Sequence, residues 1–409
     1  MTSSERMVRA RAAIVAGSRT PIGRRGGAFA TLRARDLGAA VIAETLARST
    51  VEPEAVDDVV LGSTLAPEGN PARVAALQAG VPIRVPARSI DRQCGSGIDS
   101  VWMAAQSITS GAMDIVLAGG MESMTHEPFQ LERSARAFAP TPPQFLAREL
   151  SPAALGNPGM GTTAENLAES YAISRSEQDR YACTSQRRMA DATAAGVLDE
   201  AIVPVTVGST RIERDEHPRP DTTEEKLGAL RPAFLPGGTV TAGNASGIND
   251  GASCVMVMSE DEVRRRDLAP LAWVVDGAVV GVDPNVMGIG PAPAIGTLLD
   301  RTGWRLDEVD VIEINEAFAV QVLACAADLG IDSDRVNAWG GAIAHGHPIA
   351  ATGTVLIMKA IDQLARAGGG RAIVSACIGG GQGIALAIER DRSAPGVAGW
   401  RTHEHRRNT

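Results

Sequence analysis

Short apolar runs alternate with amphipathic stretches along the first part of the chain. Residues 12–16 and 59–61 are apolar runs of strand length, whereas apolar positions recur at helical spacing in residues 36–48 and 71–79. Residues 114–120 form a further apolar run, which we expect to be a buried strand. Strands that alternate with helices in this way predict parallel βαβ units and therefore an α/β fold.

The pattern changes between about residues 122 and 244. Prolines interrupt residues 140–158, a charged helix is predicted for residues 176–195, and a polar segment follows at residues 215–220. Long irregular segments in a compact enzyme often carry function, so we expect this excursion to form a lid over a site.

The second part of the chain repeats the pattern of the first. Residues 309–314 match residues 56–61, each after a predicted helix. In both parts a small-residue pair then opens a helix, and an apolar strand follows that ends in a glycine turn, at Gly119-Gly120 and at Gly379-Gly380-Gly381. We therefore expect two similar α/β halves with a shared site between them. Beyond Arg390 the tail is polar and basic, and we expect it to be frayed.

Composition and charge narrow the function classes. The chain has 409 residues and a formal net charge of −9, which argues against non-specific nucleic-acid binding. Its five cysteines are scattered without CxxC or Cys/His spacing, so neither a disulfide framework nor a structural metal is expected. We see no signal peptide and no apolar run long enough to span a membrane, and we expect a cytoplasmic protein.

Cys94 is the first candidate for chemistry. It lies on a glycine-bounded turn between a predicted buried strand, residues 87–90, and a helix whose apolar face begins at Ile98. A position close to a helix N-terminus stabilises a thiolate, so we expect a pKa below the ordinary value for Cys94. A small buried core residue at a tight turn is an equally good reading of this cysteine alone.

Three stretches of the second half add further candidates. Asn315 follows a predicted strand and is either a ligand-binding side chain or a helix N-cap. His345 and His347 lie in a glycine-rich loop, where an imidazole can move a proton, bind a metal or have no functional role. Cys377 ends an apolar strand before three glycines, and it is either a second catalytic thiol or a core residue beside a turn.

Taken together, these stretches resemble the thiolase family from about residue 12 to residue 389. The motifs that carry the resemblance are Cys94-Gly-Ser-Gly, Gly119-Gly-Met-Glu-Ser-Met124, Met160-Gly-Thr-Thr-Ala-Glu-Asn166, Gly243-Asn-Ala-Ser-Gly-Ile-Asn-Asp-Gly251, Asn315-Glu-Ala-Phe-Ala319, Gly346-His-Pro348 and Cys377-Ile-Gly-Gly-Gly381. The resemblance implies a five-layered αβαβα fold of two similar halves with a loop (lid) domain. It divides the chain into an N-terminal half (1–121 and 247–271), a loop domain (122–246), a C-terminal half (272–391) and a polar tail (392–409). It also implies a homodimer or homotetramer.

The resemblance further implies reversible cleavage of 3-ketoacyl-CoA to acetyl-CoA and a shortened acyl-CoA, in fatty acid metabolism such as β-oxidation. Coenzyme A is then a substrate, and no cofactor is bound permanently. Cys94 becomes the acyl-carrying nucleophile, His347 its activating base and Cys377 the acid/base at the α-carbon. One oxyanion hole consists of the N–H groups of Cys94 and Gly379, and the other of His347 and a water held by Asn315. The positions implied to contact CoA or the acyl chain are Ser246, Arg219, Met160, Met287 and Phe318.

Three positions depart from the family pattern. His345 replaces an apolar residue, Ala350 replaces a glycine, and Gly159 stands where short-chain biosynthetic members tend to have a histidine. The last departure favours a general 3-ketoacyl-CoA thiolase over a dedicated acetoacetyl-CoA-forming enzyme. A decarboxylating ketoacyl synthase and a non-catalytic CoA- or lipid-binding homologue are less favoured, because Cys94, His347 and Cys377 are all present.

Overall fold

The computed structural model of the chain describes residues 11–134, 136–138, 142–146, 148–392 and 400. Within these residues it forms a large central sheet and a small hairpin. The strands are β1 (Ala12–Arg19), β2 (Gly23–Arg24), β3 (Asp58–Gly62), β4 (Ala87–Ile90), β5 (Ile115–Ser123), β6 (Val205–Val207), β7 (Thr210–Ile212), β8 (Asn249–Ser259), β9 (Ala272–Gly281), β10 (Val311–Ile314), β11 (Gly370–Ile378) and β12 (Gln382–Arg390).

The strand order of the large sheet shows the two similar halves. The order is β10-β11-β12-β9-β1-β8-β5-β3-β4, with β2 paired to β8 and β6–β7 forming the separate hairpin. The first half runs β1-β8-β5-β3-β4, and the second repeats it as β9-β12-β11-β10 with a parallel bridge from Ile312 to Val336 in place of a last strand. β1 and β9 join the halves through a short antiparallel register in which Ala13 lies opposite Trp273.

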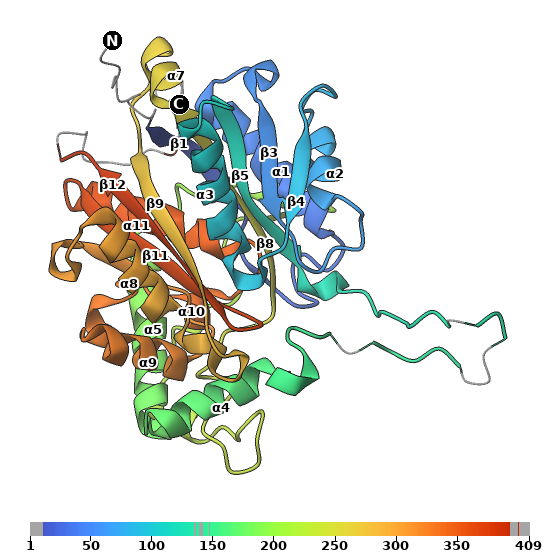
Figure 1. The fold of residues 1–409 in the computed structure, drawn as a ribbon, viewed down its shortest axis with the longest axis vertical. Helices are drawn as coiled ribbons and strands as arrows, with labels where there is room; N and C mark the ends of the chain where they lie inside the picture. The colour runs from blue at the N-terminus through green and yellow to red at the C-terminus, as the bar shows by residue number, and fades with distance from the viewer. Residues whose placement is uncertain (1–10, 135, 139–141, 147, 393–399, 401–409) are drawn as a thin grey trace, which may run out of the picture.

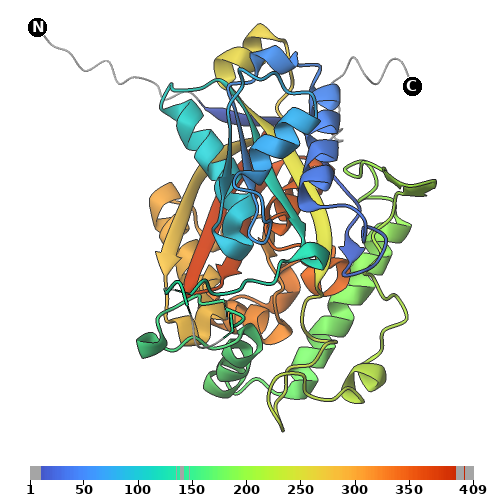
Figure 2. The ribbon, with the colours of Figure 1, turned by 90° about the vertical axis from the view of Figure 1, so that its right-hand side faces the viewer.

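Helices cover both faces of each half. They are α1 (Ala34–Ser49), α2 (Pro71–Gln78), α3 (Ser96–Thr109), α4 (Met160–Ser170), α5 (Arg175–Ala194), α6 (Glu224–Gly228), α7 (Glu260–Arg265), α8 (Pro291–Thr302), α9 (Ala319–Leu329), α10 (Ala342–His345) and α11 (Thr352–Arg366). The cluster around α3 and α11 is the central core, because it includes side chains of both halves of the sheet. Two outer cores lie under α1 and α2 and under α8 and α9. The result is the five-layered αβαβα arrangement that the resemblance implies (Figures 1 and 2).

Not every detail of the sequence-based prediction was right. The strand β4 is only half-buried, because it pairs on one side with β3 and lies at the end of the sheet order. The predicted parallel arrangement is confirmed, because β3 pairs in parallel with β4 and β5, and β1 runs in the same direction as β5 on the other side of the antiparallel strand β8. Gly119 and Gly120 lie inside β5 instead of forming a turn. In the tail, Trp400 is buried and its indole N–H donates to Asp362 at 2.9 Å, whereas the rest of the prediction of a frayed tail falls on residues 393–399 and 401–409, which lie outside the described residues.

Two positions of β5 need glycine because neighbouring backbone packs directly against them, and not because the chain turns there. A Cβ at Gly119 would collide with the carbonyl oxygen of Ser253 on β8, and one at Gly120 would collide with the carbonyl of Ala350. The segment that leads into α11 therefore packs directly on β5, which also contacts α3, the helix that follows Cys94.

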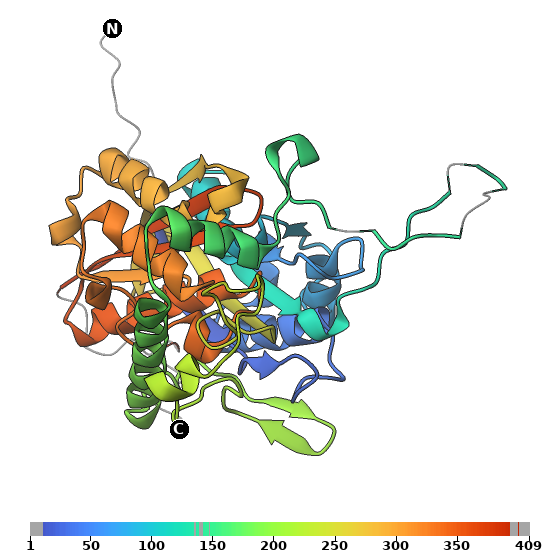
Figure 3. The same ribbon diagram turned by 90° about the horizontal axis from the view of Figure 1, so that it is seen from below.

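A long segment, residues 124–248, separates β5 from β8. It contains α4, α5 and α6, and an extended arm whose two sides run together away from the body (Figures 1 and 3). The two sides are joined by antiparallel contacts, in which the Glu132 N–H donates to the carbonyl of Gln144 and the Leu146 N–H to the carbonyl of Gln130, both at 2.9 Å. In the rest of this segment, α5 contacts α9 and α10 beside the second half of the sheet, whereas the β6–β7 hairpin packs against the outer core of the first half.

Candidate active site

Cys94 lies in a tight turn between β4 and α3. The turn, Gln93–Gly95, is a single turn of 3-10 helix, and Gln93 has a φ of 45°, which places a non-glycine residue in the left-handed region. The Asp91 carboxylate stabilises this conformation by accepting hydrogen bonds from the backbone and side-chain N–H groups of Gln93, at 2.8 and 2.7 Å. Gly95 is needed because a Cβ there would lie 2.7 Å from the side chain of Ile378. The turn is thus pressed against the residue that follows Cys377.

The expected low pKa of Cys94 was wrong. Desolvation by burial raises the pKa of the Cys94 thiol to about 11, against the lowering effect of the N–H groups of Cys94 itself and of Gly379. The charge of Glu122 raises this pKa further, and that of Arg148 lowers it. Cys94 is therefore a neutral thiol at rest, and it needs a base when it attacks.

Cys377 lies close enough to Cys94 for the charge of one to act on the other, although the two are far apart in the sequence. It is fully buried near the end of β11. Burial raises the pKa of the Cys377 thiol well above its ordinary value, and the neighbouring charge of Cys94 raises it further. A second negative charge is disfavoured beside the first, so the two sulfurs are electrostatically coupled.

His347 is held with one ring nitrogen free to act as a base. Its Nδ1 lies 2.7 Å from the hydroxyl of Thr352, and that hydroxyl donates to the carbonyl of Pro348 at 2.9 Å. The hydroxyl hydrogen is thereby used, so Nδ1 carries the proton and donates it, and Nε2 is unprotonated and has the lone pair of a base. Burial lowers the pKa of His347 to about 4, so the ring is neutral near pH 7.

Asn315 connects this imidazole to the strand of Cys377. Its side-chain N–H₂ lies 3.4 Å from His347 Nε2, and its backbone N–H donates to the carbonyl of Ser375 at 2.9 Å. Its buried Oδ1 has no hydrogen-bond partner within the described part of the chain. A buried amide oxygen of this kind can accept a hydrogen bond from a water or a substrate.

Sequence reasoning missed Thr352 and Glu122. Thr352 starts α11 five positions after His347, and this spacing at a helix start was the available signal. Glu122 is fully buried at the end of β5, where its carboxyl accepts hydrogen bonds from the hydroxyl of Thr64 at 2.7 Å and from the N–H groups of Leu65 at 3.1 Å and Ala350 at 3.3 Å. Burial raises the pKa of Glu122 to about 7. Glu122 therefore ties the loop that follows His347 to the strand beside Cys94.

The predicted substrate contacts fall into two groups. Met160, Met287 and Phe318 belong to the same apolar cluster as Cys377. Ser246 lies beside them, because its N–H donates to the carbonyl of Ala317 at 2.9 Å.

Arg219 is in a separate pocket of about 200 Å³. The pocket is lined also by His217 and Lys226, with Leu230 on an apolar wall. Its cationic side chains could hold an anionic group of a ligand. The structure therefore does not bring Arg219 into the cluster around Cys377.

The three departures also have defined places. His345 is buried, its Nδ1 lies 2.7 Å from the carbonyl of Gly346, and its Nε2 has no partner in the described residues. Ala350 is buried, and its backbone N–H donates a hydrogen bond to the carboxyl group of Glu122. Gly159 precedes α4, and a Cβ there would have open space around it.

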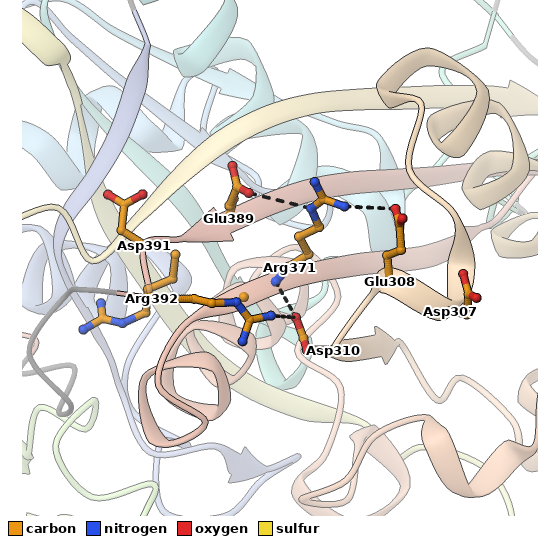
Figure 4. Close-up of a pocket in the computed structure, with 9 residues that line it drawn as sticks. Asp307, Glu308, Asp310, Arg371, Glu389, Asp391 and Arg392 are labelled. Atoms are coloured by element: carbon orange, nitrogen blue, oxygen red, sulfur yellow. Dashed lines mark hydrogen bonds and ion pairs between the residues drawn. The ribbon is translucent and has the colours of Figure 1, made fainter.

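A further pocket, of about 550 Å³, lies away from these residues (Figure 4). Its acidic side chains are paired with arginines, since Arg371 lies 3.0 Å from Glu308 and 3.7 Å from Glu389. Arg371 stands at the beginning of β11 and Cys377 near its end, which separates them by roughly 20 Å along the strand. This pocket is therefore not part of the candidate active site.

Other kinds of site receive no support in the residues that the structure describes. All five cysteines are free thiols, and no described group of three or more His, Cys, Asp or Glu side chains is arranged to hold a metal ion. None of the described helices combines the length and the apolar character that crossing a membrane requires.

The fold and the site define a class of enzyme. Two like α/β halves supply a partly buried thiol, a second, fully buried thiol, a neutral imidazole and backbone N–H groups, which are the groups needed for acyl transfer through a cysteine. The family described as "Thiolase, N-terminal domain" matches residues 12–261, and "Thiolase, C-terminal domain" matches residues 268–390. The chain belongs to the thiolase family.

Individual relatives agree with this assignment. A beta-ketoadipyl-CoA thiolase of Acinetobacter baylyi is 46% identical over 396 residues, which cover 92% of this chain and 98% of that protein. A cytosolic acetyl-CoA acetyltransferase of Mus musculus is 44% identical over 388 residues, with 92% and 98% covered. The crystal structure of human mitochondrial 3-ketoacyl-CoA thiolase in complex with CoA has a TM-score of 0.88 and 40% identity, and covers 93% of this chain and 98% of that one. The predicted family, fold and enzyme class are confirmed: the protein is a CoA-dependent acyltransferase of the thiolase type.

Proposed function

We propose that this thiolase cleaves 3-ketoacyl-CoA with CoA to acetyl-CoA and a shortened acyl-CoA, reversibly and by a ping-pong mechanism through an acylated Cys94. The observation that carries the proposal is the meeting of Cys94 and Cys377 at one place, with His347 linked to the Cys377 strand through Asn315. A ketoacyl synthase that decarboxylates its substrate has no need of the second thiol, and a non-catalytic homologue has no need of the ordered imidazole.

In the first half-reaction the Cys94 thiol gives its proton to His347 Nε2 as its sulfur attacks the 3-keto carbon. The bond between the α-carbon and this carbon then breaks, and its electron pair stays on the α-carbon of the departing acetyl-CoA. Cys377 donates its proton to that carbon. The products of this stage are acetyl-CoA, an acyl group on Cys94, a Cys377 thiolate and a protonated His347.

In the second half-reaction CoA enters and its thiol gives a proton to the Cys377 thiolate. The CoA sulfur attacks the acyl carbon, and the Cys94 sulfur leaves and takes its proton back from His347. The thioester exchange is close to isoenergetic, because one thioester replaces another. Cys377 and His347 both return to their resting states, so the cycle balances.

Negative charge develops on two different substrate oxygens during the reaction. For the acyl group on Cys94, the N–H groups of Cys94 and Gly379 are suited to stabilise an oxyanion, since both already act on the sulfur. For the acetyl-CoA enolate, we assign His347 and a water on Asn315, whose free Oδ1 supports that role. The apolar cluster of Met160, Met287 and Phe318 would accept the pantetheine and acyl chain beside Ser246. Arg219 would pair with a phosphate of CoA in its pocket.

A dedicated acetoacetyl-CoA-forming reaction is the second candidate. Relatives of similar identity are named acetyl-CoA acetyltransferase as well as beta-ketoadipyl-CoA thiolase, so the names leave the acyl group open. A series of 3-ketoacyl-CoA substrates of increasing length, assayed for CoA-dependent cleavage, tests both. Cleavage of acetoacetyl-CoA alone would favour the second candidate, and no cleavage of any member would overturn the proposed function.

We also propose a homodimer or homotetramer of cytoplasmic location, with the four-part division of the chain given above. The exposed aromatic side chains of the arm support assembly, because Phe129, Phe138 and Phe145 are 88%, 93% and 70% exposed in the single chain. The name of the mouse relative supports the location. Sedimentation of the purified protein tests the first proposal, and cell fractionation tests the second.

A further inference from the structure

The peptide unit that joins Gly346 to His347 is held on both sides by buried side chains. Its carbonyl oxygen lies 2.7 Å from Nδ1 of His345, and its N–H group donates to Oδ1 of Asn249 at 2.9 Å. His345 is 2% exposed and Asn249 is fully buried. Both polar groups of this peptide unit are therefore bonded to side chains, directly before the imidazole that we assign as the base.

His345 acts on this unit as a hydrogen-bond donor. A carbonyl oxygen only accepts, so Nδ1 of His345 carries the proton and donates it to Gly346. Burial, and after it the charges of Lys359 and Arg19, lower the pKa of His345 well below its ordinary value, so the ring is neutral. Nε2 then has a lone pair and no hydrogen, and it has no partner among the residues that the structure describes. The hydrogen bond that orients this ring is thus the one to the peptide unit before His347.

Asn249 is itself fixed at the start of β8. Its backbone pairs with Arg24 of β2, and its side-chain N–H₂ donates to the carbonyl of Gly23 at 3.0 Å. Because that carbonyl needs a donor, the amide nitrogen faces Gly23 and the amide oxygen faces His347. Gly346 is needed for this packing, since its φ is 97° and a Cβ there would lie 2.5 Å from Cγ of Asn249. The acceptor of the His347 N–H is therefore held by a rigid part of the sheet.

The same amide also reaches the Arg219 pocket. Its nitrogen lies 3.4 Å from Nδ1 of His217, and His217 lines that pocket. Desolvation, and after it the charges of Arg219 and Arg24, lower the pKa of His217 to about 4, so the ring is neutral near pH 7 and its Nδ1 can accept from the amide. Asn249 therefore connects the base to the pocket that we assign to a phosphate of CoA.

We propose that His345 and Asn249 are positioning residues for His347. They fix the peptide unit from which the imidazole extends, so that Nε2 is held where it can take the proton of Cys94. The inference rests on the proposed function, in which His347 takes that proton. Each residue acts through the backbone of His347 and not on the substrate. A catalytic group that is misplaced by about 1 Å can lose about 100-fold in rate, so a loosened peptide unit is costly.

The first test uses two variants of His345 that differ in one donor group. His345→Leu removes the donor and keeps an apolar side chain in its place, whereas His345→Asn keeps an N–H₂ group at the position of Nδ1. The rate of Cys94 acetylation is measured over a series of acetyl-CoA concentrations, by weighing the quenched intact protein. We expect the maximal rate to fall about tenfold in His345→Leu and to return to within about threefold of the wild type in His345→Asn. The acetyl-CoA concentration that gives half the maximal rate should stay within about twofold, because His345 affects the chemical step and not the binding of CoA.

The second test compares Asn249→Ala with a matched variant, Asn244→Ala, five positions earlier. Asn244 is also fully buried, and its side-chain N–H₂ donates to Asp179 at 2.9 Å. Asn249→Ala leaves the His347 N–H without its acceptor, and we expect the maximal rate of acetylation to fall by about 10- to 100-fold. The half-maximal concentration should also rise, because His217 loses its partner in the Arg219 pocket. Asn244→Ala should lower the melting temperature to a similar degree, but the maximal rate by less than about threefold.

The possible outcomes separate the inference from the function beneath it. A wild-type maximal rate in His345→Leu, or a His345→Asn variant as slow as His345→Leu, would overturn the role of His345. Equal maximal rates for the two alanine variants would overturn the role of Asn249. In each of these cases a wild type that is acetylated on Cys94 leaves the thiolase mechanism intact. Failure of the folded wild type to become acetylated would contradict the proposed function itself.

Discussion

The hydrogen bond from His347 to Thr352 is the feature that makes the imidazole a base, and Thr352→Val removes it with little change in shape. In the structure the Thr352 hydroxyl accepts from Nδ1 at 2.7 Å and donates to the Pro348 carbonyl at 2.9 Å. Without this acceptor, the Nδ1–H group is buried and unpaired. The ring then favours the tautomer with its proton on Nε2, which cannot accept the proton of Cys94.

The size of the effect follows from the cost of an unpaired buried donor. That cost is about 1–3 kcal/mol, which corresponds to roughly a 5- to 150-fold shift between the tautomers. We therefore expect the rate of Cys94 acetylation by acetyl-CoA to fall by about 10- to 100-fold. The rate can be followed by quenching the reaction at short times and weighing the intact protein.

A matched control is available two positions along the same helix. Thr354 is also fully buried, and its hydroxyl donates to the carbonyl of Gly97 at 2.9 Å without contacting His347. Thr354→Val should lower stability to a similar degree but acetylation much less, and Thr352→Ser should restore most of the rate. Equal rates for the two valine variants would refute the reasoning, as would a serine variant as slow as Thr352→Val.

Three other predictions follow from the site. Cys377→Ala should still be acylated on Cys94 but should not exchange the α-protons of acetyl-CoA with deuterium, and full exchange would remove Cys377 from the mechanism. Because burial lowers the pKa of His347 to about 4, kcat/KM should show no acid limb near the ordinary value of 6.5, and a limb there in a pH profile would contradict the neutral base. Glu122 has a pKa of about 7 in the folded protein against 4.5, so between these values the folded state holds a proton that the unfolded chain releases. Wild-type stability should therefore fall by about 3 kcal/mol as the pH rises through this window, and urea unfolding of Glu122→Gln should lack that fall.

Local pattern predicted most of the architecture. The apolar runs in the sequence predicted the strands β3, β5 and β10. The likeness of residues 56–61 to residues 309–314 predicted two similar halves, and the strand order repeats between them. The pairing of individual strands was not visible in the same way. Antiparallel pairing of β8 with β1 and β5 depends on a strand that returns after the long excursion, and no local signal indicates its direction.

The errors at Cys94 and in β5 have a common origin in contacts between distant segments. A helix start alone favours a thiolate, but desolvation of the thiol in the folded chain outweighs that effect and the lowering by the Gly379 N–H, and raises the pKa of Cys94. Gly119 and Gly120 resembled a turn, although their lack of side chains serves the approach of Ser253 and Ala350. Because these neighbours come from other parts of the chain, spacing within a motif could not reveal them.

The candidate site shows the same limit. Cys94, Asn315, His347 and Cys377 stand in motifs that the sequence displays. The structure brings Cys377 within range of the charge of Cys94 and links His347 through Asn315 to the strand of Cys377. Thr352 lies within reach of a local argument, since it opens a helix shortly after His347.

The central claim is that the Cys94 sulfur carries the acyl group. Its most direct measurement is the mass of the intact protein after mixing with acetyl-CoA, followed by peptide mapping of the adduct. We predict one acetyl group per chain, on Cys94, which disappears when CoA is added. Folded protein that gains no acetyl group, or that carries it on another residue, would contradict the account.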